Sequence, residues 1–126
     1  MKKLMKAKER KGFTLIELVI VVAIIGILAL MIIPQFNNVT KDAKIKTYEA
    51  NFRTCISAVA MYQAAHGGEY PATGADLDDY LDGTFASLQN NPDGASYDIS
   101  GSGATWALTG SYTDDAGDPH DKTYPN

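Results

Sequence analysis

The chain has only one cysteine, Cys55, so no disulfide bond can form within it. Its two histidines, His66 and His120, fall at a predicted helix end and in a predicted loop. Neither is predicted to stand beside a nucleophile on an ordered element. Nucleophilic catalysis therefore has no support in the sequence, and we expect a protein that is not an enzyme.

Basic residues are scarce beyond the first twelve positions. Residues 1–12 hold six basic residues and one acidic residue, a charge of +5, and because the whole chain carries −4, residues 13–126 carry −9. The basic residues that remain there are Lys41, Lys44, Lys46, Arg53 and Lys122. We therefore expect no broad basic patch and no direct nucleic-acid site.

What the chain does have is an apolar run of 21 residues from Phe13 to Ile33. As a helix it would be about 31 Å long, enough to cross the hydrocarbon core of a bilayer. The basic residues before it predict that the N-terminus lies in the cytoplasm, by the positive-inside rule. One carboxylate, Glu17, lies near the start of the run, where its cost in a membrane makes it a candidate functional residue.

Three simpler interpretations of this run explain it less well. A secretory signal peptide would have a shorter apolar region, followed by a small-residue cleavage site that is missing before Pro34. A helix in the core of a soluble protein would show a polar face, which this run lacks apart from Thr14 and Glu17. A plain membrane anchor fits the length but needs neither Glu17 nor the Gly12-Phe13 junction.

The residues Lys11-Gly12-Phe13-Thr14-Leu15-Ile16-Glu17 and the apolar stretch after them resemble the class III signal of type IV pilins and type II secretion pseudopilins. The resemblance is tight over residues 11–36. It implies that a prepilin peptidase cuts between Gly12 and Phe13 and methylates the new N-terminal Phe13. It also implies that Glu17 of an incoming subunit pairs with the Phe13 ammonium of its neighbour in a filament.

A second implication concerns Gly26 and Pro34. Proline lacks an amide hydrogen and should kink or locally end the helix, and glycine is also a poor helix former. In filaments of the family this stretch is often unwound. We expect the same here, and only a bend in an isolated subunit.

Four segments follow from composition and periodicity: a cleaved leader (1–12), a membrane and assembly helix (13–34), an amphipathic half of the same stem (35–66) and a small β-rich head (67–126). Apolar residues at three- and four-residue spacing predict one continuous helix from about residue 14 to residue 66. The head should contain a short helix from Thr73, strands at 96–100 and 105–109 joined at Gly101–Gly103, and a third strand near Tyr112 or residues 122–124. The predicted fold is α+β, a pilin-like lollipop.

The segment 114–121 is strongly acidic. Asp114, Asp115, Asp118 and Asp121 supply the oxygens that Ca²⁺ prefers, and a bound ion would clamp the C-terminal segment in place of a disulfide. Their spacing does not match an EF-hand, and a solvated acidic loop is the alternative.

We therefore predict a prepilin that leaves the inner membrane through an assembly platform and polymerises with its own copies into a type IV pilus at the cell surface. Membrane lipid would surround the apolar helix before assembly. Two alternatives stay within the family: a pseudopilin of type II secretion or a competence pilin. A third is a membrane-anchored extracytoplasmic binding domain that never polymerises.

Overall fold

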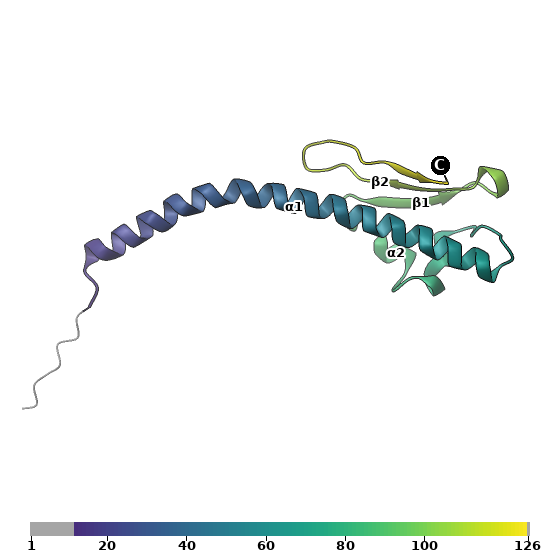
Figure 1. Ribbon diagram of the computed structural model, residues 1–126, viewed down its shortest axis with the longest axis horizontal. Helices are drawn as coiled ribbons and strands as arrows, with labels where there is room; N and C mark the ends of the chain where they lie inside the picture. The colour runs from purple at the N-terminus through teal and green to yellow at the C-terminus, as the bar shows by residue number, and fades with distance from the viewer. Residues whose placement is uncertain (1–11, 126) are drawn as a thin grey trace, which may run out of the picture. The chain divides into compact units, whose positions relative to one another are not determined.

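The computed structural model describes residues 12–125, so the leader residues 1–11 lie outside the described part. Its main element is one helix, α1 (Leu15–Ala65), drawn from purple to teal in Figure 1. This confirms the continuous helix that the periodicity predicted. Pro34 lies inside α1 and does not end it.

The chain divides into two compact units, one up to Asn37 and one from Asn38 onward, and α1 contributes to both. In the first unit the large apolar side chains between Phe13 and Ile33 are 49–94% exposed. This part of α1 is long and apolar enough to cross a membrane. By length and composition it therefore fits the predicted membrane anchor.

The second unit combines the rest of α1 with an antiparallel sheet of three strands in the order β1 (Ser96–Ser100), β2 (Ala107–Ser111) and β3 (Lys122–Tyr124). The sheet runs alongside this part of α1 (Figure 1). Two short 3₁₀ helices, η1 (Gly74–Tyr80) and η2 (Gly103–Thr105), and one short α-helix, α2 (Phe85–Leu88), complete the unit. The α+β prediction is confirmed.

The first strand of the predicted hairpin is correct, whereas the second begins two residues later than predicted. Ser100 pairs with Ala107, so the connection is longer than the glycine turn that we expected. The reason is η2, where the Ser102 amide donates to Oγ1 of Thr105 at 3.3 Å and extends the turn. Trp106 therefore precedes β2 instead of lying in it. Leu108 lies in both the predicted and the observed strand, and its side chain is buried.

The core of the second unit forms where one face of α1 meets the sheet. Tyr48, Phe52, Cys55 and Val59 are buried along α1 at the predicted spacing. The Tyr48 ring lies against Tyr97 of β1 and Tyr112, with centroids 5.8 and 5.6 Å apart. Burial raises the pKa of the Cys55 thiol to about 11, so Cys55 behaves as a small apolar core residue.

Candidate functional site

The start of α1 is closed by a pair of reciprocal contacts between Thr14 and Glu17. The Thr14 amide donates to Oε2 of Glu17 at 2.9 Å, and the Glu17 amide donates to Oγ1 of Thr14 at 3.3 Å. This is a capping box, in which two amides without helical partners are satisfied by side chains. We did not predict a role for Thr14, although the spacing Thr-x-x-Glu before an apolar run is the known signature of such a box.

Gly12 and Phe13 precede the helix. Both lie outside regular secondary structure, and Phe13 is 94% exposed. The junction between them therefore lies in irregular, accessible backbone, as cleavage by a peptidase requires. The pairing of Glu17 with a neighbour's Phe13 concerns two copies and stays a prediction.

Gly26 and Pro34 both lie within the unbroken α1. A Cβ added at Gly26 would meet nothing within 4 Å in the single chain, so no contact within the subunit requires glycine there. Unwinding between these residues concerns the filament and stays a prediction. A filament map with continuous helical hydrogen bonds from Gly26 to Ala43 would contradict it.

The acidic segment is organised around one buried carboxylate, Asp114, which is 5% exposed. Its Oδ1 accepts the amides of Ala116 and Asp118 at 2.9 and 3.0 Å. Its Oδ2 lies 3.1 Å from Nζ of Lys41 and 3.1 Å from Nε2 of His120. Both oxygens are thus occupied, and one of the contacts reaches back to α1.

The other three aspartates do not converge with Asp114. Asp115 pairs with Nζ of Lys44 at 2.9 Å, Asp118 lies 3.8 Å from Lys41, and Asp121 accepts a hydrogen bond from Ser111 at 2.7 Å. Within residues 12–125 no three acidic, histidine or cysteine side chains are placed to hold a metal ion. This arrangement does not fit a Ca²⁺ site, which needs several oxygens around one point. Calcium binding stays a prediction, without support from this geometry.

Lys41 and Lys44 are half-buried residues that fasten the acidic segment to α1. From the sequence we predicted no contact for either lysine. No local pattern could reveal their role, because Lys44 and Asp115 are 71 residues apart in the sequence. We name this set of contacts, Asp114 with Lys41 and Asp115 with Lys44, the lysine clamp.

The charged state of Asp114 is strongly favoured. Burial by itself raises its pKa, but the Asp118 amide, His120, Lys41 and the Ala116 amide together outweigh burial and hold the pKa well below its usual range. A carboxyl group with a lowered pKa stabilises the fold above its unfolded pKa of about 4 and loses that effect as the pH falls.

We therefore expect Asp114→Asn to lower the melting temperature of the full chain in detergent at pH 7. The difference from wild type should shrink below about pH 4, because the unfolded chain then binds the proton. Asp115→Asn is the matched control: its carboxylate is mostly exposed, so its loss should matter less. A higher melting temperature in added Ca²⁺ would support the calcium site predicted from the sequence. Equal effects of the two substitutions at pH 7 would show that Asp114 has no special role.

Comparisons with known proteins support the interpretation of the N-terminal segment. The family described as "Prokaryotic N-terminal methylation motif" matches residues 7–33. The type II secretion system core protein G of Pseudomonas aeruginosa is 35% identical over 69 residues, 55% of this chain and 48% of that protein. A type IV major fimbrial protein of Dichelobacter nodosus is 40% identical over 82 residues, 62% of this chain and 51% of that protein.

A fimbrial protein of Pseudomonas aeruginosa is 60% identical over a shorter stretch of 38 residues, 30% of this chain and 25% of that protein. The chain thus spans about half the length of the first two relatives. No solved structure matches it. The comparisons confirm the resemblance to type IV pilins and type II secretion pseudopilins that residues 11–36 indicated.

Proposed function

We propose that this chain, which resembles the type IV pilins and pseudopilins, is a non-enzymatic filament subunit made as a precursor. A prepilin peptidase cleaves it between Gly12 and Phe13 and methylates Phe13, and the mature subunit polymerises into a type IV pilus at the cell surface. One observation carries this proposal. An exposed apolar helix bears a single carboxylate at its start and follows an accessible Gly12-Phe13 junction.

We expect the exposed apolar half of α1 to lie in two successive environments, first the bilayer and then the filament. So much contiguous apolar surface is unfavourable in water and needs lipid or other apolar helices around it. Before assembly the bilayer surrounds it, with the basic leader on the cytoplasmic side. During assembly an inner-membrane platform moves the helix from lipid into a bundle of identical helices, where neighbours replace the lipid.

A second candidate function is that of a type II secretion pseudopilin, favoured by the similarity to core protein G over 55% of this chain. Pseudopilins of the family share the same N-terminal processing and assembly, so the N-terminal segment does not separate the two. A pseudopilin, a competence pilin or a membrane anchor that never polymerises would not cover the cell with filaments. Electron microscopy of sheared surface material, identified by mass spectrometry, separates these functions: abundant filaments of this protein support the pilus, and their absence refutes a major pilin.

Processing supplies the direct test of the proposal. We expect the intact mass of the mature protein to correspond to a chain that begins at Phe13 with one added methyl group. Gly12→Val should leave the full-length precursor in the membrane, because a branched side chain next to the scissile bond obstructs a site that accepts glycine. A mature N-terminus at any residue other than Phe13 would contradict the assignment.

A further inference from the structure

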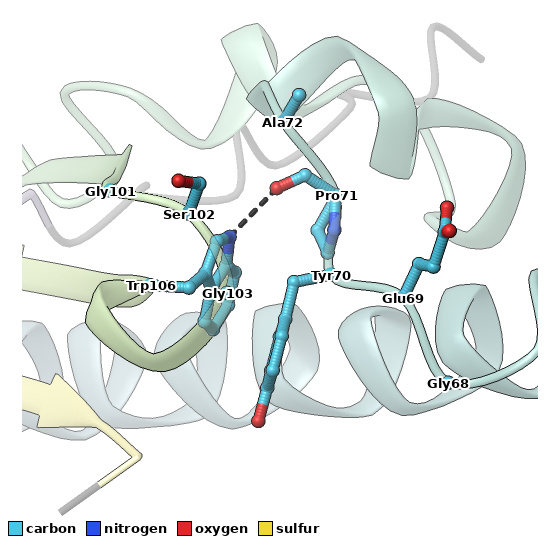
Figure 2. Close-up of a pocket in the computed structure, with 9 residues that line it drawn as sticks. All are labelled: Gly68, Glu69, Tyr70, Pro71, Ala72, Gly101, Ser102, Gly103 and Trp106. Atoms are coloured by element: carbon cyan, nitrogen blue, oxygen red, sulfur yellow. Dashed lines mark hydrogen bonds between the residues drawn. The ribbon is translucent and has the colours of Figure 1, made fainter.

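The second unit contains a recess that the proposed function does not use. It has a volume of about 430 Å³ and lies between the loop after α1, residues 68–72, and the loop 101–103 with Trp106. Figure 2 shows these two loops facing each other, with Tyr70 between them. The two loops form two walls of the recess, and the aromatic side chains of Tyr70 and Trp106 form the third.

The aromatic wall is rigid. The Tyr70 ring stacks on the Trp106 indole, with centroids 4.5 Å apart and planes at 19°. Nε1 of Trp106 donates to the Pro71 carbonyl oxygen at 2.7 Å, a buried hydrogen bond drawn as the dashed line in Figure 2. Trp106 is only 4% exposed, so the half-buried Tyr70 ring offers the aromatic face that a ligand can reach.

A carboxylate stands on the other side of this ring. In Figure 2 Trp106 lies on one side of Tyr70 and Glu69 on the opposite side. Within residues 12–125 the Glu69 side chain makes no ion pair or hydrogen bond. An aromatic face next to an unpaired carboxylate is the arrangement that attracts a cation, through the ring quadrupole and the charge together. A planar guanidinium suits it best, because it stacks on the ring while it hydrogen-bonds to the carboxylate.

The same chain carries a matching cation. Lys41, Lys44 and Lys122 are engaged in ion pairs with Asp114, Asp115 and Glu49. Of the arginine and lysine residues in the described range, this leaves Lys46 and Arg53 without an ion pair, and Arg53 is the one arginine. Arg53 is exposed on α1, at the edge of a second recess that also contains Ile56 and Tyr124.

Arg53 and the first recess cannot meet within one subunit. Arg53 precedes the end of α1 at Ala65 by twelve residues, about 18 Å along the helix axis. The Glu69 amide donates to the His66 carbonyl oxygen at 3.3 Å, which holds Glu69 at that end. Between two copies they can meet. A filament is built from heterologous contacts, in which one surface of a subunit meets a different surface of the next and the same contact repeats.

We propose that the guanidinium of Arg53 from one subunit enters the recess of another, stacks on Tyr70 and pairs with Glu69. This inference rests on the proposed function, because it names a contact between heads in the filament. The contact would fix the register of the heads, and the N-terminal segment of α1 would supply most of the apolar burial.

Reversal of the two charges tests the pair in the full-length protein. Arg53→Glu and Glu69→Arg should each reduce the ratio of sheared filaments to cell-associated mature subunit by roughly tenfold. The double variant, which restores opposite charges, should recover most of the yield. Lys46→Glu and Asp79→Arg are matched controls that change charge by the same amounts on exposed residues of α1 and η1, and they should leave the yield near wild type.

Each result decides the question. Wild-type yield in either single variant, equal losses in the controls, or two losses without recovery in the double variant would overturn the pairing. In each of these cases wild-type filaments persist and the proposed function stands. If wild type itself makes no filaments while its mature N-terminus is Phe13, the proposed pilus is wrong and the pairing is wrong with it.

Discussion

Glu17→Ala should abolish most filament assembly while membrane insertion and cleavage between Gly12 and Phe13 continue. In the filament core we expect the Glu17 carboxylate to pair with the Phe13 ammonium of a neighbour, where little water is available to either charge. Removing one partner of a buried ion pair costs about 3–5 kcal/mol, because the other charge stays buried. That corresponds to a loss of roughly two to nearly four orders of magnitude in association.

The capping box adds a second role for Glu17, and one further variant separates the two. Glu17→Gln keeps the side-chain oxygen that accepts the Thr14 amide, and glutamine is itself a capping-box residue. It lacks the charge, so it should assemble almost as poorly as Glu17→Ala. Glu17→Asp keeps the charge on a shorter side chain and should be intermediate.

The measurement is again sheared filament against cell-associated mature subunit. If Glu17→Gln made filaments at the wild-type level, the charge would be unnecessary and Glu17 would act only as a helix cap. If Glu17→Ala made filaments at the wild-type level, assembly would need neither the charge nor the helix cap of Glu17.

Gly110→Val should strongly destabilise the second unit, although valine favours strands. Strand propensity alone predicts stabilisation, since glycine weakens a strand interior. The structure predicts destabilisation instead. A Cβ at this position of β2 would lie 2.8 Å from Cδ2 of Phe52 and 2.8 Å from the hydroxyl oxygen of Tyr48, both buried on α1. Overpacking of this kind typically costs about 1–3 kcal/mol, and Gly110→Ala should show a smaller part of the effect.

Thermal unfolding of the full chain in detergent provides the measurement. Trp106, the one tryptophan of the chain, is buried in this unit and reports its unfolding by fluorescence. Ser96→Val on β1 is the matched control, because Ser96 is exposed and a surface change of this type usually stays within about 0.5 kcal/mol. A melting temperature for Gly110→Val at or above that of wild type would show that the sheet can move away from α1 at no cost.

Features that depend only on the spacing of neighbouring residues could be predicted from the sequence. The apolar run, the position of Glu17 within it and the Gly12-Phe13 junction need only neighbouring residues for their meaning. The buried face of α1 follows from a period of three to four residues, and β1 from a period of two, so both were correct. The capping box of Thr14 and Glu17 was equally local and could have been predicted.

Contacts between residues that are far apart in the sequence could not be predicted. The sequence showed four clustered aspartates and suggested a metal, whereas folding placed Asp114 beside Lys41 and Asp115 beside Lys44. A cluster of like charges is compatible with a cation from any source, and only the packing of the C-terminal loop on α1 selects lysines of the same chain.

Trp106 illustrates the same division between local and distant information. Trp106 and Leu108 are both buried, because side chains two residues apart point to the same face of an extended segment. Trp106 is excluded from β2 by the 3₁₀ turn before it, because its amide donates to the Gly103 carbonyl oxygen at 3.3 Å. Its indole donates to the Pro71 carbonyl oxygen, 35 residues earlier. Periodicity determines which side of an element is buried, and the tertiary structure alone decides which distant group that side meets.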